Sequence, residues 1–176
     1  MSRTLYTKPE LKIIKEIINR ANKKENIYLF KRENEIYVCF NGICEIKVCT
    51  VCDFPYNMES GIFTTPQWDP LEKILKEKIS NEIDVYFSSP DKNGMCQILP
   101  NAAGVEKIGI DGKKAAFLGK DCKFKLFATE TCLYYSVYNE FNEFIGIFCI
   151  AKTEYGADLK PEIEKMIKYS EAAKTA

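Results

Sequence analysis

Apolar residues recur at helical spacing in three segments: residues 9–21, residues 70–79 and a segment that begins near Pro161. The first two segments each carry a proline in the first turn, directly after a polar capping sequence. Their stripes predict amphipathic helices that pack on a sheet. The residues expected to face the core are Leu11, Ile14, Ile17, Ile18 and Ala21 of the first segment, Leu71, Ile74, Leu75 and Ile79 of the second, and Ile163, Met166, Ile167 and Ser170 of the third.

Short β-rich runs separated by turn residues occupy most of the remaining chain. Turns such as Asn41-Gly42 and Asp111-Gly112 join neighbouring runs, so hairpins should dominate and the pairing should be mainly antiparallel. We therefore predict one α+β domain over residues 1–176, a mainly antiparallel sheet of about eight strands with three helices packed on it. The β-rich runs are residues 27–30, 35–40, 43–52, 83–88, 95–99, 107–110, 113–118, 123–128, 132–138 and 144–151.

The dipeptide Asn41-Gly42 predicts a two-residue hairpin loop, because both residues tolerate a positive φ. A loop of this length also sets the register of the two strands. The pairs predicted from it are Phe40 with Ile43, Cys39 with Cys44, and Tyr37 with Ile46.

The two capped helices have similar sequences, and each precedes β-rich runs. One hypothesis is a duplication of a helix-plus-sheet unit, covering residues 9–52 and 70–128. The alternative is that amphipathic helices built from Lys, Glu, Ile and Leu resemble one another without common origin.

Residues 53–69 form the longest stretch without periodicity and contain two prolines and the only tryptophan. Long irregular segments in compact domains are often functional, and rigid aromatic residues are common in binding hot spots. We predict an interaction surface here. The alternative is a structural crossover whose rings pack onto the sheet. The aromatic residues in question are Phe54, Tyr56, Phe63 and Trp68.

The 176-residue chain has 25 basic and 25 acidic residues, so its formal net charge is zero and no global attraction to nucleic acid or an anionic membrane is expected. The apolar runs never reach the ~18 residues of a membrane span. Residues 1–6 lack the apolar core of a signal peptide. We therefore expect a cytoplasmic protein that does not bind membranes.

Six lysines occur between residues 107 and 125, close to several phenylalanines. They form a candidate anion or nucleic-acid patch. The alternation in Cys122–Phe127 equally fits a half-buried strand with solvated lysines, and arginine, the better phosphate ligand, is absent from this stretch. The lysines are Lys107, Lys113, Lys114, Lys120, Lys123 and Lys125.

Eight cysteines lie mostly in strand-like runs, which is typical of buried reduced thiols. A Cys-x-x-Cys pair at Cys49 and Cys52, with Cys39 and Cys44 nearby, raises the alternative of a zinc or redox site. In an extended strand residues three apart point to opposite faces, so this pair cannot reach one ion. We expect no metal and no cofactor.

The chain contains no histidine. Catalytic triads, Cys-His dyads and imidazole bases are therefore excluded within this chain. An enzyme would have to use carboxylate, lysine or thiolate chemistry, and no phosphate-binding glycine motif is present.

The C-terminal part has a recognisable order of elements: two β-rich runs joined by the polar turn 139–143, with Ile145-Gly146-Ile147 in the second run, then a terminal helix. Over residues 132–172 this order resembles the end of a GAF- or PAS-type sensor domain. The resemblance implies a small-molecule or regulatory module, and it transfers no ligand-contact residue.

Three functions follow from these patterns. The first is a non-catalytic protein that binds another protein; the Lys-, Ile- and Asn-rich composition is typical of AT-rich genomes and fits a phage or mobile-element inhibitor of a host system. The second is a GAF/PAS-like small-molecule sensor. The third is an enzyme that works without histidine, which would need a cleft with perturbed titratable groups.

Overall fold

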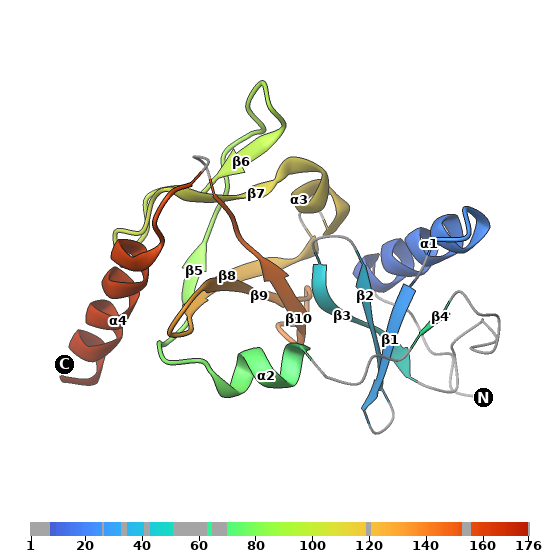
Figure 1. Cartoon of the computed structure of the whole chain (residues 1–176), viewed down its shortest axis with the longest axis horizontal. Coiled ribbons are helices and arrows are strands. Elements are labelled where there is room, and N and C mark those ends of the chain that lie inside the picture. The colour runs from blue at the N-terminus through green and yellow to red at the C-terminus, as the bar shows by residue number, and fades with distance from the viewer. Residues whose placement is uncertain are drawn as a thin grey trace.

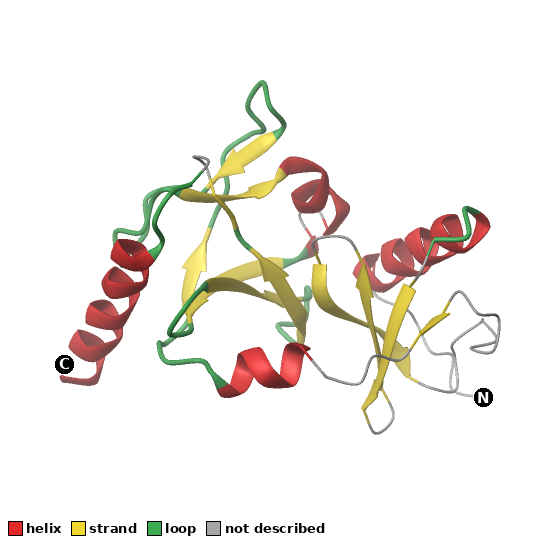
Figure 2. Cartoon of the chain, in the orientation of Figure 1, coloured by secondary structure: helices red, strands yellow, loops and turns green. Residues whose placement is uncertain are grey.

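The computed structural model describes residues 8–25, 27–32, 35–40, 43–50, 63–64, 70–118, 121–152 and 156–175. Helices and strands alternate irregularly along this part of the chain (Figures 1 and 2). The helices are α1 (Lys8–Asn22), α2 (Pro70–Lys76), α3 (Gly112–Leu118) and α4 (Lys160–Thr175). The strands are β1 (Ile27–Arg32), β2 (Glu35–Phe40), β3 (Ile43–Thr50), β4 (Phe63–Thr64), β5 (Ile83–Val85), β6 (Met95–Gln97), β7 (Ile108–Asp111), β8 (Lys123–Ala128), β9 (Leu133–Tyr138), β10 (Phe144–Cys149) and β11 (Ala151–Lys152).

The α+β class and the antiparallel pairing are confirmed, but the pairing divides the strands between two sheets. The longer ladder runs β4-β1-β2-β3-β10-β9-β8-β5, and a separate sheet runs β11-β7-β6. The prediction of a single sheet is therefore wrong. Within the described residues the one parallel pair is β1 with β4, where Ile27 lies beside Phe63. Residues 63–64 thus have regular pairing inside the segment predicted to be irregular.

The prediction of a strand at residues 113–118 is also wrong, because these residues belong to helix α3. The Oδ1 atom of Asp111 accepts hydrogen bonds from the backbone N–H groups of Lys113 (2.8 Å) and Lys114 (3.3 Å). Asp111 therefore caps the N-terminus of a helix instead of starting a hairpin turn. The sequence Lys-Lys-Ala-Ala that follows consists of good helix formers. The structure has four helices in its described part, not three.

The β2–β3 register agrees with the prediction at one position only. Phe40 pairs with Ile43 as predicted, but the register shifts between Val38 and Phe40. Val38 then pairs with Ile46, so the prediction of Tyr37 opposite Ile46 is wrong, and Cys39 and Cys44 fall within the irregular part of the register and do not form the predicted pair. A bulge in β3 accounts for the shift. The turn residues 41–42 lie outside the described residues.

Two apolar clusters lie on opposite faces of the longer ladder. Side chains alternate along β8, so Phe124 and Leu126 join the main cluster, whereas Phe127 joins the smaller one. The main cluster includes side chains of α1, α3 and α4, and the smaller cluster is covered by α2. Helix α2 thus lies on the other face of the ladder from α1, α3 and α4 (Figure 1).

The buried helix stripes differ from the predicted ones. In α1 the fully buried residues are Ile17, which was predicted, and Ile13, which was not, while the predicted Leu11 is 53% exposed. In α2, Leu71 is buried but Leu75 is exposed. The stripe of α4 is confirmed for Ile163, Met166 and Ser170. The predicted duplication of residues 9–52 and 70–128 stays a prediction.

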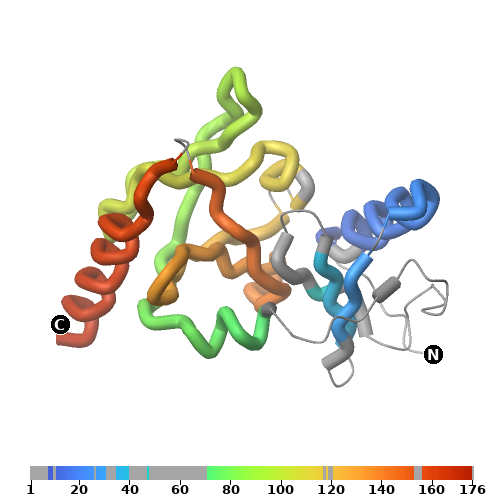
Figure 3. The backbone as a smooth tube through the Cα atoms, viewed as in Figure 1, coloured from blue at the N-terminus to red at the C-terminus, as the bar shows by residue number. Residues whose placement is uncertain are grey.

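None of the described helices is both long and apolar enough to cross a bilayer. The connection between β5 and β6 projects from the body of the molecule (Figure 3). Asp91 stabilises its turn, since Oδ1 accepts hydrogen bonds from the N–H groups of Asn93 (2.8 Å) and Met95 (3.0 Å).

Candidate functional site

The chain changes sheets directly after β5. Val85 is the last residue of β5 in register with β8, opposite Phe124. The carbonyl oxygen of the next residue, Tyr86, accepts a hydrogen bond from the N–H of Leu99 (2.8 Å), and Phe87 bridges to Ile98. Residues 83–88 thus begin in one sheet and end beside the extension of β6. We call this divergence of β5 from β8 the fork.

An open pocket of about 700 Å³ lies at the fork and is here called the groove. Its apolar lining comes from Val85, Phe87, Ala115 and Phe124. The ring of Phe87 lies edge-on to the rings of Phe124 (5.4 Å between centroids) and Tyr135 (5.2 Å). These contacts fix the apolar side of the groove to the main core.

Three charged side chains line the groove: Asp84, Lys123 and Lys125. The two lysines are two residues apart in β8 and so lie on the same face of the ladder, and Asp84 is opposite Lys125 in register. Among the described residues, none of the three belongs to an ion pair. The ammonium group of Lys125 lies 4.9 Å from the centre of the Tyr138 ring, a cation–π contact.

Exposed aromatic residues flank the groove. Tyr86 lines it and is 71% exposed. Asn142 also lines it, and the neighbouring Phe141 in the same turn is 68% exposed. Buried Asn139 shapes this turn, because Oδ1 accepts hydrogen bonds from the N–H groups of Phe141 (3.0 Å) and Glu143 (2.9 Å). Both aromatic residues are therefore presented to solvent by defined backbone.

The thiol of Cys122 also lines the groove. Burial, together with the charge of Asp121, raises the pKa of this thiol to about 12. It therefore stays protonated at neutral pH, whereas a nucleophilic cysteine must be a thiolate. Among the described residues that line the groove, there is no activated thiol.

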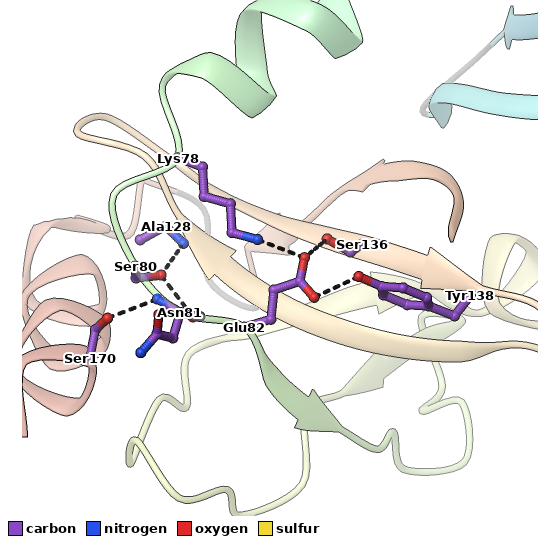
Figure 4. Close-up of polar contacts among 8 residues, drawn as sticks. All are labelled: Lys78, Ser80, Asn81, Glu82, Ala128, Ser136, Tyr138 and Ser170. Carbon is purple, nitrogen blue, oxygen red and sulfur yellow. Dashed lines mark hydrogen bonds and ion pairs between the residues drawn. The ribbon is translucent and has the colours of Figure 1, made fainter. Parts of the chain in front are cut away.

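A second polar region is centred on Glu82, two residues before Asp84 of the groove, and is here called the Glu82 cluster (Figure 4). The carboxylate of Glu82 accepts hydrogen bonds from Ser136 (2.7 Å to Oε1) and Tyr138 (2.7 Å to Oε2), and Lys78 lies 2.8 Å from Oε1. Burial alone would raise the pKa of Glu82, but the hydrogen bonds from Lys78, Ser136 and Tyr138 outweigh it and hold the pKa below its usual value. The same carboxylate raises the pKa of Tyr138, after the larger effect of burial.

The residues between Lys78 and Glu82 connect three elements. The Oγ atom of buried Ser80 accepts a hydrogen bond from the N–H of Ala128 at the end of β8 (2.8 Å). The N–H of Asn81 donates to the hydroxyl of Ser170 in α4 (2.8 Å). Figure 4 shows these contacts on either side of the chain that leads into β5. Together they hold the start of β5, and hence one side of the fork, in place.

Tyr138 joins the two regions: its hydroxyl group donates to Glu82, and its ring lies under Lys125. Lys125 in turn lines the groove. The Glu82 cluster therefore supports the groove without contributing a reactive group to it.

Three of the aromatic residues predicted to form an interaction surface, Phe54, Tyr56 and Trp68, lie outside the described residues. The fourth, Phe63, lies in β4 beside Ile27 of β1. That prediction stays open.

Of the lysines in the predicted patch, the structure brings Lys123 and Lys125 together in the groove. Strand β7 lies between Lys107 and Lys113, which places them about 13 Å or more apart along the chain. Lys114 is next to Lys113 in α3, and Lys120 lies outside the described residues. Lys123 and Lys125 come together in the groove with Asp84. Within β8 the burial pattern also fits the solvated-strand alternative, since Phe124 is buried and Lys123 is exposed.

The described residues contain no group of three or more acidic, cysteine or histidine side chains arranged to hold a metal ion. Cys52 lies outside them, so the Cys-x-x-Cys pair stays untested. No local pattern signals the fork, because the run from Ile83 to Ser88 looks like one uninterrupted strand.

No family model, no curated protein and no solved structure matches this chain.

Proposed function

We propose that the chain is a non-catalytic binding protein that holds a segment of another protein in the groove at the fork. The observation that carries this proposal is an open groove with an apolar lining, charged lining side chains that form no ion pair among the described residues, and the exposed ring of Tyr86. Exposed aromatic residues beside a cleft are what binding hot spots are made of. The more specific hypothesis of a phage or mobile-element inhibitor rests on composition alone.

The chemistry of the groove supports binding over catalysis. Its thiol is protonated. The carboxylate of Asp121, next to this thiol, is paired with Lys8 and Lys12, and that of Glu82 accepts from three donors; the pKa of each lies below its usual value. A general base needs a pKa near the working pH and access to the substrate. Glu82 has a lowered pKa and is only 16% exposed.

Site-specific photo-crosslinking tests the proposal. A photoreactive phenylalanine derivative replaces Tyr86 in one variant and exposed Tyr28 of β1 in a matched control. In cells that carry the gene, we expect irradiation to give a discrete crosslinked protein from position 86 and none, or a different one, from position 28. The same product from both positions, or no product from position 86, would contradict the proposal.

A second candidate is the small-molecule sensor that the GAF/PAS resemblance implies. The volume of the groove favours it, because about 700 Å³ lies within the usual range of ligand pockets. A test is mass spectrometry of the protein purified under non-denaturing conditions. A ligand released from the wild-type protein but not from a Phe87→Ala variant would favour the sensor.

A further inference from the structure

We infer that the segment held in the groove is an extended, acidic stretch of a partner protein, with a carboxylate at Lys123 and an apolar side chain against Phe87. This inference rests on the proposed function and specifies the chemistry of the partner. Its basis is the combination of the first residue of β8, which lies beyond the β5 register, a net positive charge among the lining side chains, and an apolar lining at the fork.

The first argument is the open side of β8. The pairing of β5 with β8 ends at Val85 and Phe124. The carbonyl oxygen of the next residue, Tyr86, accepts a hydrogen bond from the N–H of Leu99 instead. Among the described strands, Lys123 therefore has a neighbour only in β9, where it pairs with Tyr138. Lys123 is the one residue of β8 that lies beyond the β5 register at the fork, and an uncovered strand end is a place where an extended segment can add.

The second argument is charge. The charged side chains that line the groove are Lys123, Lys125 and Asp84, a net charge of +1 (two lysines minus one aspartate). Asp84 lies opposite Lys125, which leaves Lys123 at the uncovered end of β8 without an acidic neighbour in register. A carboxylate on the incoming segment would supply the missing charge, and complementary charge favours association and sets orientation.

The third argument is the spacing of polar and apolar groups. Side chains two residues apart in an extended chain lie about 7 Å apart on one face, as Lys123 and Lys125 do. An extended partner segment has the same repeat. It can therefore place a carboxylate near the lysines while a neighbouring apolar side chain contacts Phe87 and Ala115, which also line the groove. A helix has no such two-residue repeat.

The experiment combines crosslinking with charge reversal. The photoreactive residue at position 86 captures the partner, and mass spectrometry identifies the crosslinked segment. We expect a segment with alternating apolar and acidic residues. Lys123→Glu should lower the crosslinking yield about tenfold, whereas the matched control Lys168→Glu, on exposed α4 surface, should leave it unchanged. Replacing the partner's carboxylate by lysine should restore the yield with the Lys123→Glu variant.

The outcomes separate the two proposals. A crosslinked partner whose yield does not depend on Lys123, or whose captured segment is basic or helical, overturns this inference and leaves the proposed function standing. No crosslinked protein from position 86 overturns both. A product formed from two copies of this chain also overturns the inference. Urea unfolding of the Lys123→Glu variant must match that of the wild type, because an unfolded variant would lose binding for another reason; Lys123→Gln, which keeps the side-chain length, then repeats the test.

Discussion

The Glu82 cluster and the groove lie side by side around β5, and they differ in how their charges are satisfied. Glu82 has three hydrogen-bond donors, and its oxygen atoms are 2.7–2.8 Å from them. Asp84, two residues later, lines the groove without an ion pair among the described residues. Buried charges need partners, whereas exposed charges do not. The cluster thus has a structural role, and the groove keeps charged side chains available for a ligand.

The adjacent aromatic residues Tyr86 and Phe87 show the same contrast between a packed and an exposed side chain. Phe87 points its ring into the cluster formed with Phe124 and Tyr135, while Tyr86 is exposed. Alternation along an extended chain sends adjacent side chains to opposite sides. Phe87 therefore packs on the core side of the groove, whereas the preceding residue, Tyr86, is exposed to solvent. Five predictions test this division, in order of decreasing expected effect.

The largest effect concerns the reactivity of Cys122. At pH 8 a thiol with a pKa of about 12 has on the order of a thousandfold less thiolate than one at the ordinary value of 9.0. We expect Cys122 to react with iodoacetamide at least a hundredfold more slowly in the folded protein than in urea. Peptide mass spectrometry measures the rate at this site. Fast alkylation under native conditions would show an activated thiol and would reopen the thiolate-enzyme hypothesis.

The second prediction removes the centre of the Glu82 cluster. Glu82→Ala leaves Lys78 and buried Ser136 without their partner and should lower the free energy of unfolding by about 2–4 kcal/mol. Asp84→Ala is the matched control and should change it by less than about 0.5 kcal/mol. Urea unfolding measures both. Equal effects of the two substitutions would contradict the comparison.

The third prediction removes one neutral hydrogen bond. Ser80→Ala leaves the N–H of Ala128 without its acceptor and should cost about 1–3 kcal/mol of unfolding free energy. Exposed Ser89→Ala should be close to neutral. A neutral Ser80→Ala variant in urea unfolding would mean that the contact between residue 80 and β8 does not stabilise the fold.

The fourth prediction is a pH dependence. The pKa of Glu82 in the folded protein lies below its ordinary value of 4.5. The stability from Glu82 is therefore fully present above about pH 4.5 and is lost as the pH falls through the lower folded-state pKa. We expect the difference in unfolding free energy between wild type and Glu82→Gln to be larger at pH 7 than at pH 3. The same difference at both pH values would contradict the lowered pKa.

The smallest effect is expected for the exposed aromatic residue. Tyr86→Ala should change the unfolding free energy by less than about 0.5 kcal/mol, because its side chain is 71% exposed. Phe87→Ala should cost about 2–4 kcal/mol, since it removes two edge-on ring contacts. Thermal and urea unfolding measure the pair. A large loss for Tyr86→Ala would show that this ring is structural and would weaken the proposed function.

Local patterns predicted three of the described helices and most strands, because caps and apolar spacing act over a few residues. Both ends of α1 and the start of α4 agree closely with the prediction. Helix α3 was missed because Asp111-Gly112 was interpreted as a hairpin turn, although the same aspartate is a good helix cap. The β2–β3 register was missed beyond Phe40 because a bulge has no sequence signature here.

The sequence by itself determined the α+β class, the absence of histidine chemistry and the zero net charge. Only the tertiary structure decided which lysines meet, where the chain changes sheets and which carboxylate is buried. Glu82 and Asp84 are both acidic residues at the start of one strand, and nothing in their immediate sequence tells them apart. Their difference arises from β9, which supplies Ser136 and Tyr138 to Glu82 from more than fifty residues away. Partners so distant in sequence are brought together by strand pairing, and that is why the groove could be found only in the folded chain.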